Sequence, residues 1–197
     1  LTSSLLVAMP QLQDPNFNRS VLLMVEHETS ASFGLVLNRP ADLLLSDLFG
    51  SLEFEWKGDD TATAAWGGPV EPGSGWMLFG DSPSLSPVDE QVSRVSDGVN
   101  FGGSLDVIKH VAESPPACLR FFLGYSGWGP GQLEFEIAQG AWLSAEAIPE
   151  VIFDVPPEAM WDHVVRGLGI DPPAPAHAEM EDERLVAVGV DQAELGP

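Results

Sequence analysis

The chain has 197 residues, 44% of them hydrophobic and 19% charged, which is enough to bury the core of one large domain. Its 30 Asp and Glu residues against 8 Lys and Arg give a formal net charge of −22. This balance argues against direct binding to nucleic acid or to an anionic membrane, because both require many cations. The single cysteine excludes an intrachain disulfide, and no apolar run approaches the roughly 18 residues of a membrane span.

The compartment and the partners follow from the same features. A lone cysteine fits a reducing compartment and no secretory leader opens the sequence, so we expect a cytoplasmic protein without membrane association. The acidity favours solubility or attraction to a basic protein partner, whose identity stays open, as does assembly into a homo-oligomer. The 4 histidines have neither the i, i+4 nor the H-E-x-x-H spacing of zinc sites, so neither a metal nor a cofactor is predicted.

The first third of the chain predicts strands followed by a helix. Residues 5–9 and 20–27 predict the first two strands, and the core of the second (VLLMV) is continuously apolar, which is typical of a strand covered on both faces. A polar segment joins 20–27 to a third strand at 33–38, so an antiparallel hairpin is expected. Residues 42–49 begin with Asp42 as a helix cap and predict a short helix.

The middle of the chain predicts strands and loops around one helix. The expected segments are strands at 63–66 and 75–79 joined by a Gly- and Pro-rich turn, a loop at 81–90 and a weaker strand at 92–101. Ser104 can cap a helix over 105–113, in which His110 points away from the core. The face that we expect to be buried contains Leu105, Ile108, Val111 and Ala112.

The last third predicts alternating strands and helices and then a tail. The expected segments are a strand at 118–123, a turn (GYSGWGPG), a helix over 131–139, strands near 141–144 and 151–155, and a helix over 157–168 with Met160, Trp161, Val164, Val165 and Leu168 on one face. Pro-rich and then acidic residues follow, so we expect a domain over 1–169 and a tail over 170–197. The apolar segment 185–190 is the one part of this tail with the pattern of a docking strand. Without strict βαβ alternation, the order favours an α+β fold.

Ser126 lies in the predicted turn between strand and helix, as the nucleophile of a hydrolase elbow does. The G-x-S-x-G spacing fails, because Trp128 stands where the last glycine is required. A tight Gly-rich turn is therefore favoured over a catalytic serine, and no catalytic residue is assigned. The helix start at Gly131 offers N–H groups to an anion, but a cap in which Gln132 reaches back explains the same residues without a ligand.

A second polar group is expected where the first hairpin opens. Antiparallel pairing brings Asn18 and Arg19 next to Asn38 and Arg39, which places two of the 8 cations side by side. One interpretation is an anion pocket or a partner-binding patch. The other, which is favoured, is a salt-bridged brace that ties the hairpin end to the next turn, because structural networks perturb charges as functional sites do. The carboxylates expected nearby are Asp14 and Asp42.

A further hypothesis places both polar groups at one end of the sheet, in a shared shallow cleft. Arg39 would supply charge there and the helix start at Gly131 would supply N–H donors. The residues of this candidate ligand or partner cleft are Asn18, Arg19, Asn38, Arg39, Ser126, Trp128, Gly131 and Gln132.

Three long motifs carry a resemblance to a known family. They are LLVAMPQLQDPNFNRSVLLMVEHETSASFGLVLNRP at 5–40, GGPVEPGSGWMLFG at 67–80 and FLGYSGWGPGQLEFEIAQGAWL at 122–143. In this order they resemble the signatures of the YqgE/AlgH family of bacterial proteins. The resemblance implies a single compact α+β domain with a largely antiparallel, bulged sheet flanked by helices. Family members commonly carry Ala in place of Ser126, which weakens the case for a catalytic serine.

The resemblance implies no established activity, because members are mostly uncharacterised and one branch has been proposed to regulate exopolysaccharide synthesis. The favoured function is a non-enzymatic regulatory or interaction protein that binds a small anion. The first alternative is a hydrolase that uses the loop at 124–134. The second is a transcriptional regulator that acts indirectly, since no helix-turn-helix is present in the pattern and the charge disfavours DNA contact.

Overall fold

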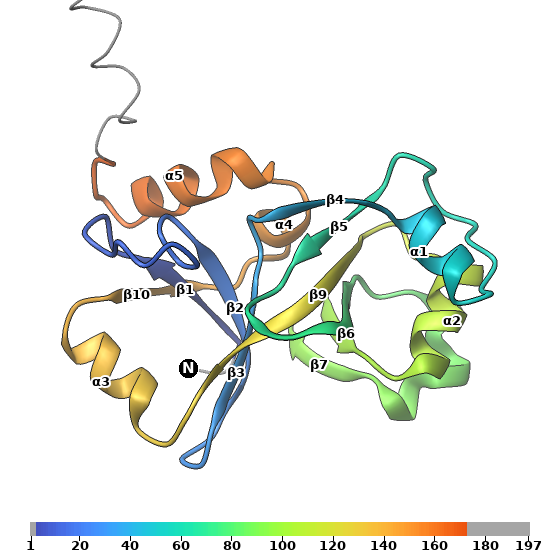
Figure 1. Cartoon of the computed structure of the whole chain (residues 1–197), viewed down its shortest axis with the longest axis horizontal. Coiled ribbons are helices and arrows are strands. Elements are labelled where there is room, and N and C mark those ends of the chain that lie inside the picture. Colours follow the sequence, from blue (N-terminus) through green and yellow to red (C-terminus); the bar gives the residue numbers. More distant parts are fainter. Residues whose placement is uncertain (1–2, 173–197) are drawn as a thin grey trace, which may run out of the picture.

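The computed structural model describes residues 3–172, except for four side chains between 84 and 89. Figure 1 shows this part of the chain as a curled sheet with helices around it. Of the predicted tail over 170–197, the residues from 173 onward lie outside the described part. The domain boundary at 169 therefore stays a prediction, and whether 185–190 docks as a strand stays open.

Ten strands form the sheet, in the order β10-β1-β2-β3-β9-β6-β8-β7, and β4 joins it through β5, which pairs with β9. The pairings between the described strands are antiparallel except the parallel pair of β5 and β9, and register shifts interrupt several of them. These findings confirm the α+β class and the largely antiparallel, bulged sheet. The strands are β1 (Ser4–Ala8), β2 (Val21–His27), β3 (Ser32–Val36), β4 (Pro40–Leu44), β5 (Thr63–Trp66), β6 (Val70–Phe79), β7 (Ser93–Ser96), β8 (Val99–Gly102), β9 (Leu119–Trp128) and β10 (Trp142–Glu146).

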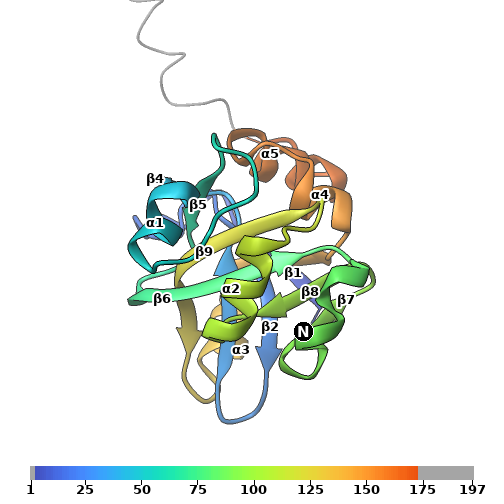
Figure 2. The same cartoon turned by 90° about the vertical axis from the view of Figure 1, so that its right-hand side faces the viewer.

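Helices cover the sheet on separate sides. The helices are α1 (Leu45–Ser51), α2 (Leu105–Glu113), α3 (Gln132–Ala138), α4 (Pro149–Phe153) and α5 (Pro157–Gly167), with a 3-10 helix over Pro83–Gln91. Figure 1 places α4 and α5 above β1, α3 below β10, and α1 and α2 at the opposite side of the molecule. Figure 2 shows α2 lying across β6 and β9. None of the helices between residues 3 and 172 is long and apolar enough to cross a membrane.

The core is divided by the sheet because strand side chains alternate between its faces. In β2, Leu23 packs with Leu5 and with Trp161 of α5, whereas Leu22 packs on the other face with Leu133 of α3. This alternation explains why the apolar run of β2 is buried throughout, as its pattern predicts. A third cluster joins α1 and α2 to β6 and β9; its largest buried side chains include Phe49, Phe79 and Phe121.

The secondary structure predicted for two segments is wrong. The segment predicted as a helix over 42–49 begins as strand β4, which pairs with β5, and α1 starts only at Leu45. The reason is the alternation of exposed and half-buried residues in β4, a strand period that the capping signal at Asp42 obscured. The segment predicted as a strand over 151–155 begins inside helix α4, which has Pro149 in its first turn and ends at Phe153. Short apolar runs do not distinguish the two structures.

Smaller differences concern 81–101 and two leucines. The predicted loop at 81–90 contains the 3-10 helix, and the predicted single strand at 92–101 is the hairpin of β7 and β8, which turns at Asp97 and Gly98. An Asp-Gly pair between apolar segments is a hairpin signal that could have indicated it. Leu105 and Leu168 lie at helix ends and are 65% and 39% exposed, although both were assigned to buried faces.

Candidate functional site

Asn38 ties the two strands of the first hairpin together at their open end. Its side chain is buried; Oδ1 accepts a hydrogen bond from the Val21 N–H at 2.8 Å, and Nδ2 donates to the Arg19 carbonyl at 2.9 Å. Arg39 donates to the Asn18 carbonyl, and partial burial lowers the pKa of its guanidinium. The structure thus brings these four residues together, and both the oxygen and the nitrogen of the Asn38 amide bind the backbone.

Arg19 connects this hairpin end to α5. Its guanidinium forms an ion pair with Asp162 at 2.7 Å and lies over the Trp161 ring, 4.4 Å from the centroid. The expected carboxylate neighbours, Asp14 and Asp42, are therefore not the partners of this arginine. The charge of Arg19 is thus compensated within the fold, as in a brace, but the brace ties the hairpin end to α5 and not to the next turn.

Ser126 lies in the middle of a strand and not in a turn. β9 continues through Ser126 to Trp128; the residue is 1% exposed, and its hydroxyl donates to the Gly67 carbonyl at 3.3 Å. The predicted turn at 124–131 is therefore wrong over most of its length, because pairing with β3 and β6 extends the strand. Without a strand–turn–helix geometry, Ser126 does not occupy a nucleophile elbow.

The start of α3 is closed by side chains of the same segment. Gln132 Oε1 accepts a hydrogen bond from the Gly129 N–H at 3.1 Å, as the capping interpretation predicts, and its Nε2 donates to Glu136 Oε1 at 2.9 Å. Glu136 Oε2 accepts the indole N–H groups of Trp128 and Trp142 at 2.9 and 2.8 Å. These polar groups satisfy one another, which is the arrangement expected of a structural network.

The two polar groups lie at opposite ends of β3. Ser32 pairs with Trp128 and Gly34 with Ser126, so β9 leads toward Gly131 at the first end of β3. Arg39 follows the last residue of that strand, at the other end. The structure therefore does not bring the two groups together into one shared cleft, because β9 runs antiparallel to β3 and leads away from Arg39.

Arg120 is the residue that the sequence reasoning missed. It stands in β9 and donates to the carbonyls of Leu37 at 2.5 Å and Ile152 at 3.1 Å, with the Phe122 ring centroid 5.2 Å away. Burial lowers the pKa of this guanidinium to about 10. Its side chain lines a hollow of about 310 Å³, between β5, β9 and the start of α5. An arginine inside an apolar strand (CLRFFL) was the signal that could have drawn attention to it.

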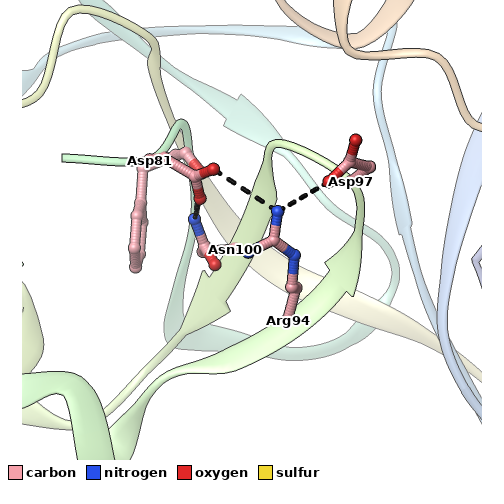
Figure 3. Close-up of polar contacts among 5 residues, drawn as sticks. Asp81, Arg94, Asp97 and Asn100 are labelled. Atoms are coloured by element: carbon pink, nitrogen blue, oxygen red, sulfur yellow. Dashed lines mark hydrogen bonds and ion pairs between the residues drawn. The ribbon is translucent and has the colours of Figure 1, made fainter.

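Arg120 has no carboxylate within ion-pair distance among residues 3–172, although Asp154 lies exposed in the same hollow. Arg94, which lines a different hollow, gives the contrast. Figure 3 shows its guanidinium between the carboxylates of Asp81 and Asp97, at 3.4 and 2.8 Å. The charge of Arg94 is compensated, whereas that of Arg120 is met only by carbonyl dipoles and an aromatic face.

Among residues 3–172, no group of three or more His, Cys, Asp or Glu is arranged to hold a metal.

Comparison with known proteins assigns the family. The family model described as AlgH-like matches residues 5–173. The chain belongs to the AlgH-like family. A UPF0301 protein of Myxococcus xanthus is 43% identical over 180 residues, which cover 87% of this chain and 93% of the relative. A second UPF0301 protein, from Ruegeria pomeroyi, is 40% identical over 174 residues, with coverage of 87% and 93%.

Two solved structures are similar to this chain in fold. The solution structure of the AlgH protein from Pseudomonas aeruginosa has a TM-score of 0.71 and 29% identity, covering 98% of this chain and 95% of its own. A crystal structure of a Corynebacterium diphtheriae protein has a TM-score of 0.67 and 25% identity, with coverage of 88% and 87%. The names of these relatives assign no activity, so the function has to be argued from the geometry.

Proposed function

We propose that this AlgH-like protein is a non-enzymatic interaction protein that binds a small anion at Arg120. The observation that carries the proposal is a partly buried guanidinium that lines a hollow and has no carboxylate partner among the described residues. Buried charges are normally paired, because removing them from water is costly. An anion in the hollow would compensate this charge.

The surroundings of Arg120 support an anion in two ways. The carbonyls of Leu37 and Ile152 hold the guanidinium in place while using only part of its set of N–H donors, so others are available to a ligand. The hollow is also lined by Pro156 and Pro157, where the 11-residue helix α5 begins. The N-terminus of a helix carries partial positive charge, which favours an anion.

The size and charge of the hollow define the ligand class. Its volume of about 310 Å³ is at the lower end for ligand sites, which suits a compact carboxylate or phosphate. Asp154 and the net charge of −22 oppose binding, so the proposed affinity is modest and depends on salt. The guanidinium suits a carboxylate and a phosphate alike, because its planar group can donate two parallel hydrogen bonds to either.

The alternatives have less support. Ser126 is buried and donates to a carbonyl, so the hydrolase function lacks an accessible nucleophile. Direct DNA contact lacks the required cations, since the chain has only 8 Lys and Arg. The proposal includes a regulatory role through a protein partner. That partner would distinguish the anion-bound protein from the anion-free protein.

Titration calorimetry and amide NMR with inorganic phosphate and with acetate test the proposal. We expect at least one anion to bind and to shift the amide signals of Thr63 and Phe121, which line the hollow. Arg120→Gln should weaken binding by about tenfold or more, which is the loss of one charge-assisted hydrogen bond or ion pair. The matched variant Arg94→Gln removes a compensated arginine and should leave binding unchanged.

Two outcomes would contradict the proposal. One is the absence of binding by either anion to the folded wild-type protein. The other is an equal loss of affinity in Arg120→Gln and Arg94→Gln, which would mean that only the overall charge matters. If Arg120→Gln unfolds, Arg120→Lys keeps the charge but loses the planar fork, and should still weaken binding.

A further inference from the structure

A second hollow lies on the sheet near the β2–β3 turn, and its lining is acidic and aromatic. Across neighbouring strands, Glu26 pairs with Phe33, and Phe33 pairs with Gly127. Further along β9, Tyr125 pairs with Val70 of β6. Residues that pair directly in antiparallel strands share a face of the sheet. These side chains therefore surround a hollow of about 370 Å³.

The aromatic wall of this hollow is held rigidly. The rings of Phe33 and Tyr125 lie 4.7 Å apart, and Phe33 also contacts Trp76 and Phe101 at 5.0 and 5.7 Å. Trp76 stacks on Phe101 at 5.4 Å. These four rings come from four adjacent strands and are half-buried. Phe33 and Tyr125 line the hollow, and Trp76 and Phe101 support Phe33 from outside it.

Gly127 leaves space in the hollow, and Glu26 gives it a negative charge. Gly127 is exposed and paired with Phe33; a Cβ there would lie 3.4 Å from the Tyr125 ring, so the glycine leaves the space beside that ring open. Glu26 is exposed and is the single charged residue among the eight that line the hollow. The lining thus combines aromatic rings with one carboxylate and contains no cation.

We propose that this hollow binds an organic cation, namely an alkylated ammonium or a guanidinium group. The faces of aromatic rings attract cations through their quadrupoles, and such ligands gain most where rings and a carboxylate act together. The apolar substituents of the cation would contact Phe33 and Val70 while its charge faces Glu26. A plain metal ion is a poor match, because one carboxylate supplies few of the oxygen ligands that it needs.

The negative net charge of the whole protein also favours a positively charged ligand. A net charge of −22 raises the local concentration of cations around the molecule. The hollow uses none of the residues that line the Arg120 hollow, so the two proposals can fail independently. The ligand chemistry fits either a free small molecule or a basic side chain of a protein, and the experiment has an arm for each.

Amide NMR titrations test the inference. The probes are choline, its neutral isostere in which carbon replaces nitrogen, and arginine capped at both ends. We expect choline or capped arginine to shift the amide signals of Gly127 and Ser32 with millimolar affinity, and the neutral isostere to bind at least about threefold more weakly. Tighter binding of capped arginine points to a basic protein partner, and tighter binding of choline points to a small metabolite.

Matched variants separate this site from general acidity. Glu26→Gln should weaken cation binding by about fivefold, whereas Glu28→Gln, an equally exposed change outside the hollow, should have no effect. Tyr125→Phe keeps the ring and should bind as wild type, while Tyr125→Leu should bind more weakly. The inference is overturned if no probe shifts these amides, if the neutral isostere binds as tightly as choline, or if both Gln variants behave alike.

Discussion

The indole N–H of Trp161 donates to the carbonyl of Ala8 at 2.8 Å, so a residue of the last helix closes on the first strand across 153 positions of sequence. The same indole carries the guanidinium of Arg19 on its face. Both partners belong to the N-terminal part of the chain. Trp161 therefore attaches α5 to the sheet through a directed contact and not through apolar packing alone.

Trp161→Phe should lower the free energy of unfolding by about 1 to 3 kcal/mol, because it leaves the buried Ala8 carbonyl without its donor while keeping most of the apolar area. The measurement is urea unfolding followed by circular dichroism. Trp56→Phe is the matched control, since its indole donates to the Asp59 carbonyl in an exposed loop at 3.1 Å. A loss in the control as large as that in Trp161→Phe would contradict the argument.

Asn38→Asp should destabilise the fold more than Asn38→Ala. The amide of Asn38 accepts from Val21 and donates to the carbonyl of Arg19, and a carboxylate cannot make the second contact. It would instead bring negative charge against a carbonyl oxygen at a buried site, with an expected cost of about 2 kcal/mol or more. Thermal unfolding measures the order of the two variants; equal melting temperatures would show that the hairpin brace contributes little.

Glu136→Gln should loosen the segment between β9 and β10. One carboxylate oxygen of Glu136 serves two indoles and the other accepts from Gln132, so an amide would place one of its own donors against an existing donor. We expect a loss of about 1 to 2 kcal/mol and a change in tryptophan fluorescence. Glu134→Gln on the exposed side of α3 is the control and should change neither property.

The sequence was sufficient to predict those elements that depend on residues close together in the chain. Helix α2 begins as predicted, with the Ser104 hydroxyl accepting the Val107 N–H, and α5 begins with Pro157 in its first turn. The first hairpin also forms as expected, because a short polar loop joins two apolar strands. These features depend on residues only a few positions apart.

Features that depend on distant pairing were not predicted. β9 runs past Gly124 because its last residues pair with β3 and β6, and no local sequence pattern indicates those partners. The site at Arg120 has the same origin, since its carbonyl acceptors lie 83 and 32 residues away. The candidate cleft residues have an unusual local composition, but contacts within the fold use several of their polar groups: Asp162 binds Arg19, and the Gly67 carbonyl accepts from Ser126.

Asp154→Asn should strengthen binding of inorganic phosphate at the Arg120 hollow. Asp154 is exposed and lines the same hollow without an ion pair to Arg120, so its charge opposes an incoming anion and contributes little to the fold. Removing that charge should raise the affinity by about threefold at low salt, and the gain should shrink as salt screens the repulsion.

The control is Asp97→Asn, which removes one of the two carboxylates at Arg94 and should leave phosphate binding at the Arg120 hollow unchanged. Calorimetry at two salt concentrations measures the affinities, and thermal unfolding measures the stability of each variant. If Asp154 were in fact the counter-ion of Arg120, its replacement would lower the melting temperature clearly, because a partly buried guanidinium would lose its partner. A drop in stability without a gain in affinity would therefore assign the pair to the fold, and a gain in affinity at unchanged stability would support the anion site.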